Sequence, residues 1–67
     1  MYINVAKVKR LMFENRFSVQ ALADASGISL PTAYRILYGR SISLTVARKA
    51  AQALGVKPIE IVEDDND

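Results

Sequence analysis

The sequence predicts a small all-α domain, and three observations lead to this prediction. Apolar residues recur at three- and four-residue intervals, the spacing of a helix face, along the 67 residues. Residues that favour helix starts and helix ends follow one another at intervals of one short helix. No segment alternates apolar and polar residues over the length of a β-strand, so no sheet is expected.

The first helix is expected over residues 4–15. Asn4 can cap it, because its side-chain oxygen can accept an otherwise unpaired N–H of the first turn. The apolar positions of this segment share one face of a helix, which we expect to point inward: Val5, Val8, Leu11 and Met12.

Two short helices joined by a tight turn are expected over residues 17–39. Ser18 can cap the first of them. Its inward side is formed by small or aliphatic residues: Leu22, Ala23 and Ala25. Gly27 follows its end, where the left-handed backbone conformation costs least for a residue without Cβ. Ile28 is expected to fill the corner of the turn.

The second helix of this pair is expected over residues 29–38. Ser29 can cap it, and Pro31 falls in its first turn, where its missing N–H would be unpaired anyway. Its inward positions repeat at helical spacing, and Gly39 closes the unit; the inward residues are Ala33, Ile36 and Leu37. A helix, a short glycine-containing turn and a second capped helix form a helix-turn-helix, whose second helix typically enters the DNA major groove.

A fourth helix is expected from its cap, Ser43, to the residue before Gly55. Its inward side is rich in alanine, which predicts a close approach to its neighbours: Ala47, Ala50, Ala51 and Leu54. A fifth, short helix is expected over 58–62, although Lys57 is a poor cap. The chain has no internal repeat and no linker. These five helices therefore predict one domain, 1–62, followed by an acidic tail, 63–67, that we expect to be disordered.

The charge of the chain indicates attraction to polyanions. The formal net charge is only +2. Residues 1–62, however, carry nine basic and three acidic side chains, a net charge of +6, and residues 63–67 carry four acidic ones. A basic body of this size is drawn to nucleic acid in a salt-dependent manner, although such an excess can also serve solubility alone.

The composition argues against several function classes. The chain has no Cys and no His, so it offers neither disulfides nor the usual zinc ligands, and we expect no metal or other cofactor. The three carboxylates before the tail, Glu14, Asp24 and Glu60, fall on separate expected helices. Without a base–nucleophile pair or a glycine-rich phosphate loop, an enzyme is not expected. No apolar run long enough to span a membrane and no secretory signal occurs, which predicts a cytoplasmic protein without membrane contact.

The order of these motifs resembles the Cro and lambda-repressor-like helix-turn-helix domains (the XRE type), a large bacterial and phage group of five-helix DNA-binding domains. The resemblance covers roughly residues 5–62. It is carried by Leu22-Ala23, Gly27-Ile28-Ser29, the stretch 32–36, Gly39, and Ala53-Leu54-Gly55-Val56. The headpiece of the LacI-type repressors has a similar recognition helix, but its motif begins almost at the N-terminus. Here a full helix comes first, which favours the Cro-like assignment.

The resemblance implies that the helix over 29–38 lies in the major groove. The residues that would meet base edges are Leu30, Pro31, Thr32, Tyr34 and Arg35. The family often has Gln or another polar residue at the first two of these positions, so the usual readers of adenine are missing. Leu30 can pack on a thymine methyl group, and Arg35, the expected main specificity residue, can pair with guanine O6 and N7. The alternatives are a solvated Arg35 and a purely structural role for Leu30 and Pro31.

The resemblance also implies phosphate contacts on both sides of that helix. At the start of the preceding helix, outward backbone amides can hold a phosphate, although the family's Gln stands where this chain has valine. Arg40 and Ser41 match phosphate-binding positions just past the recognition helix. The expected phosphate-binding residues are therefore Ser18, Val19, Gln20, Ser29, Arg40 and Ser41. Tyr38 is expected to pack against the fourth helix instead.

Together these features predict a nucleoid-associated regulator of transcription, acting as a repressor on a pseudo-palindromic double-stranded DNA operator. Two copies are expected to form a weak homodimer on DNA, because one such domain buries little surface. Pairing would use the region of Ile59, Ile61 and Val62 or the connection after Gly39. The alternatives are a protein-docking module on the same fold, or the DNA-binding part of a longer repressor or antitoxin.

Overall fold

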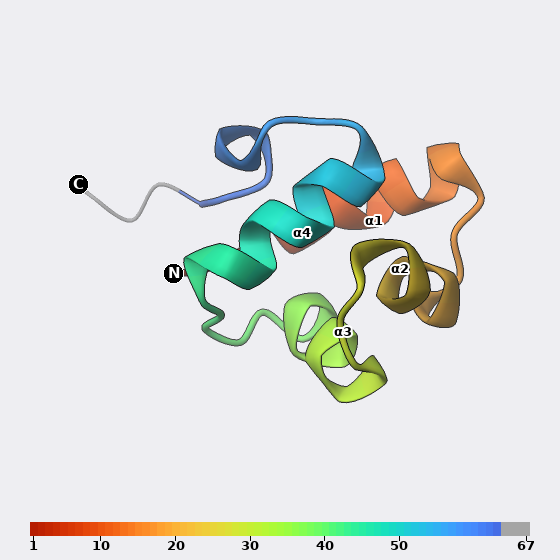
Figure 1. Cartoon of the computed structure of the whole chain (residues 1–67). Helices are drawn as coiled ribbons and strands as arrows, with labels where there is room; N and C mark the ends of the chain where they lie inside the picture. Colours follow the sequence, from red (N-terminus) through yellow and green to blue (C-terminus); the bar gives the residue numbers. More distant parts are fainter. Residues whose placement is uncertain (64–67) are drawn as a thin grey trace.

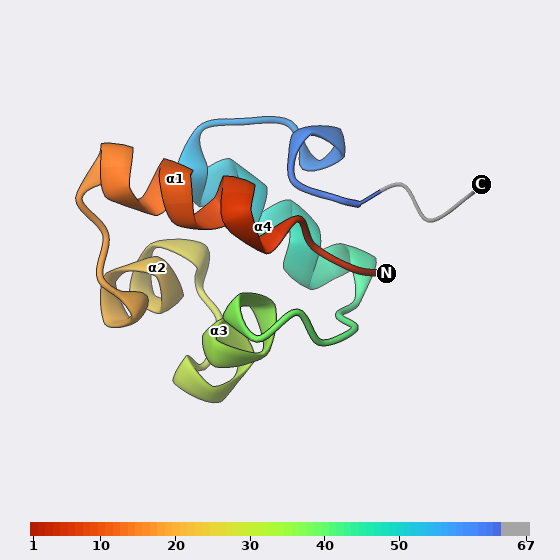
Figure 2. The same ribbon diagram turned by 180° about the vertical axis from the view of Figure 1, so that it is seen from behind.

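The computed structural model describes residues 1–63 of the protein, and in these it contains four α-helices and one short 3₁₀ turn. The elements are α1 (Val5–Asn15), α2 (Val19–Ser26), α3 (Leu30–Leu37), α4 (Leu44–Leu54) and η1 (Pro58–Glu60). Helices α1 and α4 lie against each other in the upper half of Figure 1, and α2 and α3 lie below them. Figure 2 shows the same arrangement from behind. The all-α class predicted from the sequence is confirmed.

All four helices begin in the same way, as the sequence predicts. A polar side chain precedes each helix and accepts the backbone N–H three residues later, which satisfies one unpaired donor of the first turn. The distances lie between 3.1 and 3.2 Å. The capping residues are Asn4, Ser18, Ser29 and Ser43.

All four helices also end in the same way. A residue in the left-handed conformation follows the last turn, and the next N–H bonds to a carbonyl five residues back, at 2.8–3.1 Å. Glycine occupies this position after three helices, where a side chain would be strained. After α1 the residue is Arg16, with φ of 59°. Because no glycine marks this helix end, the sequence does not predict it.

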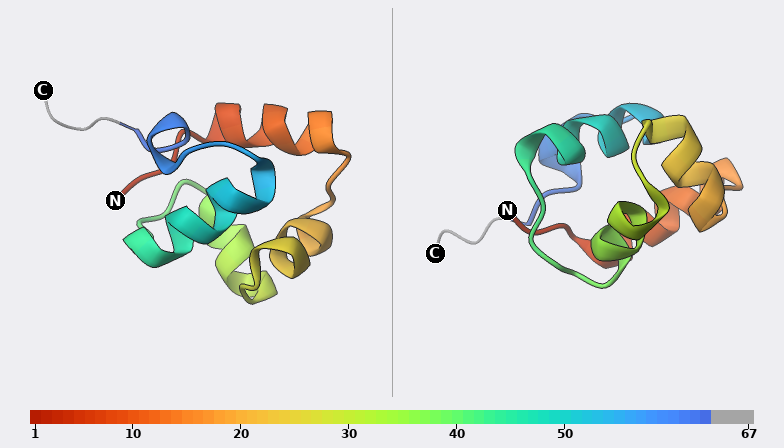
Figure 3. Two further views of the ribbon diagram at one scale, coloured as in Figure 1. Left: turned by 45° about the horizontal axis from the view of Figure 1, so that its top comes forward. Right: turned by 60° about the horizontal axis from the view of Figure 1, so that its bottom comes forward.

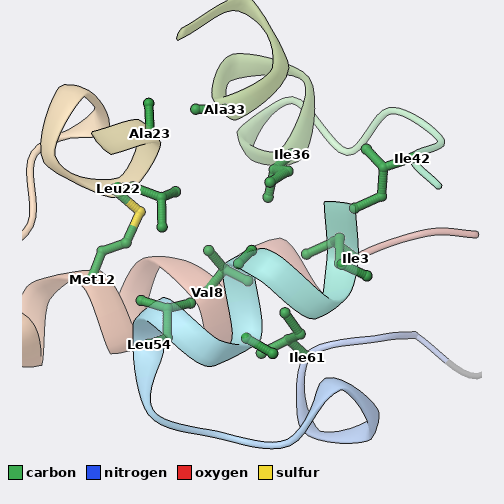
Figure 4. Close-up of a cluster of buried hydrophobic side chains, with 13 residues drawn as sticks. Ile3, Val8, Met12, Leu22, Ala23, Ala33, Ile36, Ile42, Leu54 and Ile61 are labelled. Atoms are coloured by element: carbon green, nitrogen blue, oxygen red, sulfur yellow. The ribbon is translucent and has the colours of Figure 1, made fainter. Parts of the chain in front are cut away.

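The core lies where the four helices meet (Figure 4). Its largest fully buried side chains come from three helices and the C-terminal segment: Val8, Leu22, Ile36 and Ile61. The alanine face predicted for α4 is confirmed, because Ala47, Ala50 and Ala51 are completely buried. The prediction for Ala25 is wrong. It is exposed, and Ser26 is buried instead, because the inward arc of α2 is centred between Leu22 and Ala23.

The fifth helix predicted over 58–62 is only the three-residue turn η1. The chain leaves the helical path because its backbone pairs with the N-terminal segment. The N–H of Asn4 donates to the carbonyl of Ile61 at 2.8 Å, and the N–H of Glu63 donates to that of Tyr2 at 2.9 Å. Ile3 and Val62 form an isolated antiparallel bridge between these two bonds. Glu63, the first residue of the predicted tail, is thus paired, and the rest of the tail, 64–67, lies outside the described residues.

The segment between α3 and α4 is held by the same N-terminal residues. The N–H of Ile42 donates to the carbonyl of Met1 at 2.9 Å, and Ile42 itself is buried. Figure 3 shows this connection running past the N-terminus before it enters α4. The position of the residues that follow α3 is therefore fixed by main-chain bonds. No helix within residues 1–63 is long and apolar enough to cross a membrane.

Candidate nucleic-acid interface

Helices α2 and α3 form the two arms of the predicted helix-turn-helix. Gly27, with φ of 69°, reverses the chain after α2, and no atom would crowd a Cβ there. The conformation rather than the space therefore calls for glycine. Ile28 is half-buried and packs against the core at the corner, as predicted. Ser29 then caps α3, so the turn between the two helices consists of only three residues.

Helix α3 has a buried side and an exposed side. Ala33 and Ile36 are completely buried and point toward the core (Figure 4). Of the five residues predicted to meet base edges, Pro31, Tyr34 and Arg35 are exposed. Leu30 and Thr32 are half-buried at the start of the helix, and Leu30 packs against the core. The structure thus brings the predicted readers onto one helix but leaves three of them fully at its surface.

The polar side chains of α3 already have partners within the domain. The Ser29 and Thr32 hydroxyls bond to each other at 2.8 Å. One terminal N–H of the Arg35 guanidinium donates to the carbonyl oxygen of Ser41 at 2.9 Å. This bond positions the guanidinium. Because arginine has five N–H donors, the bond still leaves donors for a ligand. It also ties the helix to the segment that follows.

The predicted phosphate-binding residues lie in two places. Ser18, Val19 and Gln20 form the start of α2, whereas Arg40 and Ser41 follow α3. In Figures 1 and 2 these two segments lie on opposite sides of α3. Phosphates on the two strands beside a groove have the same relation to a helix inserted in it. Ser29, at the turn, is exposed beside the start of α3.

The start of α2 presents backbone donors rather than side chains. Ser18 uses its hydroxyl to accept the N–H of Ala21 at 3.1 Å. Val19 is half-buried against the core, and the Gln20 amide donates to the Asp24 carboxylate at 3.0 Å. The N–H groups of the first helical turn, however, have no intrahelical acceptor. A phosphate contact here would therefore use the main chain and the helix dipole.

The segment after α3 presents a cation. Three of the four helix ends are followed by an apolar residue that packs on the core: Phe17, Ile28 and Val56. After α3 the equivalent residue is Arg40, which is exposed. Between residues 29 and 47 the chain has two basic residues, Arg35 and Arg40, and no acidic one. This part of the chain is therefore chemically suited to an anionic partner.

One surface feature differs from the sequence prediction. Tyr38 does not pack against α4 but is 71% exposed, and its ring stacks on that of Tyr34, with centroids 5.8 Å apart and planes 26° apart. The signal was present in the sequence, since the two tyrosines are four residues apart and off the line of Ala33 and Ile36. Tyrosine is also common at the edges of a core, and the prediction for Tyr38 follows that tendency instead.

The region predicted for dimerisation is only partly available. Ile61 is completely buried and Val62 is half-buried, whereas Ile59 is 79% exposed.

Within residues 1–63, no group of His, Cys, Asp or Glu side chains could hold a metal ion.

The comparison with known families decides between the resemblances considered for this fold. The sequence model of the Cro/C1-type HTH DNA-binding domain matches residues 7–67. The chain belongs to this family. The helix-turn-helix over α2 and α3 is accordingly that of a DNA-binding domain family, and the LacI-type alternative is not needed. No curated protein matches the chain.

Solved structures similar to this family member come from much larger chains. Native PhpD with cadmium atoms superposes with a TM-score of 0.82, and a mutant of hydroxyethylphosphonate dioxygenase with 0.84. Each is 25% identical to this chain and covers all of it. The chain corresponds to only 15% of the length of either protein. The same arrangement of helices is thus a small part of those proteins.

Proposed function

We propose that this domain is a sequence-specific regulator of transcription that binds double-stranded DNA with α3 in the major groove. The observation that carries the proposal is the exposed side of α3, framed by the first turn of α2 and by the cationic segment after α3. Tyr34 stands near the middle of this face, Pro31 is exposed in its first turn, and Arg35 is exposed in its last turn. Leu30 and Thr32 belong to its first turn, where a recognition helix commonly meets base edges.

Phosphate contacts would fix the domain on the duplex without reading its sequence. The first-turn amides of Ser18, Val19 and Gln20 would hold one phosphate, and Arg40 and Ser41 another on the far side of α3. Ser29, whose hydroxyl is engaged with Thr32, would contribute its N–H rather than its side chain. The Arg35–Ser41 bond supports this arrangement, because it links the base-reading helix to the phosphate-binding segment.

Repression by occupation is the mode of action that the domain supports best. A DNA-binding domain that occupies an operator can block polymerase without a further surface for contacting other proteins. The proposed function involves no catalytic step. Two copies on a pseudo-palindromic operator, with half-sites about 10 base pairs apart, would supply the specificity that one small domain lacks. Their pairing would centre on Ile59, the exposed member of the predicted dimer region. Such a protein would work in the cytoplasm, at the nucleoid.

A binding selection from a randomised duplex library tests this proposal. The protein is equilibrated with the library at moderate salt, and the retained duplexes are sequenced. We expect enrichment of an inverted repeat. Enrichment of a single short motif would reject the two-fold arrangement but keep sequence-specific binding. Retention without enrichment would reject the proposal.

A docking module within a larger protein is the second candidate. It is favoured by two strongly exposed apolar side chains, Phe13 at 85% and Ile59 at 79%, and by the presence of the same fold as a small part of dioxygenase chains. Salt distinguishes the two functions. DNA binding through several phosphates weakens steeply as salt rises, whereas an apolar docking contact barely responds.

A further inference from the structure

The exposed face of α3 is largely aromatic and apolar. Leu30, Tyr34 and Tyr38 follow one another at intervals of four residues and therefore lie along one line of the helix. Tyr34 is 40% exposed and Tyr38 71% exposed, and the two rings stack on each other. Pro31 adds a further exposed apolar surface beside Tyr34. Neither ring belongs to the core, so the stack is available to a partner.

Few hydrogen-bonding groups on this face can read a base. Helix α3 contains no Asn, Gln, Asp or Glu, so it lacks the side chains that pair with adenine or accept from cytosine. The Thr32 hydroxyl is engaged with Ser29. Arg35 remains as the one strong donor, directed by its bond to Ser41. The rest of the face offers mainly apolar contact area, and its remaining hydrogen-bonding groups are the hydroxyls of Tyr34 and Tyr38.

The major groove offers few apolar groups that the exposed face of α3 could contact. The C5-methyl group of thymine is the apolar feature that a base pair presents there. The stacked rings hold each other in place, so little side-chain freedom is lost when a methyl group packs against them. Arg35 and Arg40 are close to the two tyrosines in sequence, and no carboxylate occurs between residues 29 and 49. This charge favours the phosphate-lined groove of DNA over an apolar protein surface.

We propose that the stacked pair Tyr34 and Tyr38 reads thymine methyl groups, so that the operator is specified at α3 by thymines next to the base pair that Arg35 contacts. This inference rests on the proposed function. The inference adds to that function the base that α3 selects, thymine, and the residues that select it. Tyr34 and Tyr38 then act as specificity-determining residues, and Leu30 extends the same apolar line toward the start of the helix.

Deoxyuridine substitution tests the inference, because uracil differs from thymine only by the missing methyl group. Each thymine of the selected duplex is replaced singly, and the dissociation constant is measured at one salt concentration. We expect about four-fold weaker binding for each methyl group that is contacted. The penalty should be absent in Tyr34→Ala and Tyr38→Ala proteins. It should persist in Tyr34→Phe, which keeps the ring, and in Phe13→Ala, which removes an exposed aromatic side chain of α1.

The outcomes separate this inference from the function on which it rests. A selected duplex that binds equally well with uracil throughout would overturn the inference and leave sequence-specific binding intact. A uracil penalty that survives in both alanine variants would also overturn it, because another group or the DNA shape would then be responsible. If the selection yields no enriched duplex, the proposed function is rejected, and the inference is rejected with it. If Tyr38→Ala abolishes self-association in sedimentation and leaves the uracil penalty unchanged, the rings pair two copies and the inference is wrong.

Discussion

Arg35 combines a structural hydrogen bond with an exposed position in the last turn of α3. Its guanidinium donates to Ser41 at 2.9 Å and keeps further donors for a guanine. We expect Arg35→Ala to lose about 1–3 kcal/mol of discrimination at one base pair of the operator. Binding to duplexes that vary at that position measures the effect, with Arg48→Ala on the exposed side of α4 as the matched control. An unchanged base preference in Arg35→Ala would remove this residue from the reading set.

Substitutions of two serines, one in α2 and one that caps it, are expected to have opposite effects on stability. The hydroxyl of Ser26 is buried and has no hydrogen-bond partner among the described residues, whereas that of Ser18 caps the helix. Ser26→Ala should raise the free energy of unfolding by about 1 kcal/mol, since it removes an unsatisfied polar group. Ser18→Ala should lower it by about 1 kcal/mol. Urea denaturation measures both, and a Ser26→Ala protein less stable than the native chain would contradict this account.

Helices α3 and α4 are each capped by a serine, yet only α3 belongs to the proposed interface. Ser29→Ala and Ser43→Ala each remove one cap bond of 3.2 Å, and each should cost about 1 kcal/mol of stability. Ser29→Ala also removes the bond to the Thr32 hydroxyl. Only Ser29→Ala should also weaken binding to the selected duplex, because it loosens the first turn of α3. Paired measurements of unfolding and of DNA affinity separate the two effects. Equal losses of affinity in both variants would mean that α3 has no special part in binding.

The local chemistry of the elements could be predicted from the sequence better than their long-range pairing. The caps Ser18, Ser29 and Ser43 and the glycine ends follow from rules that involve only a few neighbouring residues. The short η1 could not be predicted in this way. Its length depends on bonds between residues 61–63 and the N-terminal segment, about 60 positions away. The sequence prediction places Tyr38 inward, because tyrosine is common at core edges, and therefore does not include its stack with Tyr34.

At the scale of the whole molecule, binding should show the salt dependence of a basic domain on a polyanion. Each phosphate contact by a cation contributes about one to the slope of log affinity against log salt. We expect Arg40→Gln to reduce the magnitude of this slope by about one and to weaken binding to all sequences alike. Lys49→Gln, an exposed charge on α4, is the control that removes the same charge elsewhere. If both variants change the slope equally, only the net charge matters and Arg40 contacts no phosphate.

The central claim is that the exposed side of α3, with the two segments beside it, is the surface that meets DNA. An NMR titration of the ¹⁵N-labelled protein with the selected duplex tests it most directly, because every backbone amide reports separately. The account predicts that the largest shifts occur over residues 29–41 and at the first turn of α2, and that the amides around Phe13 change little. The largest shifts on the outer side of α1 or around Ile59, with α3 unaffected, would contradict it.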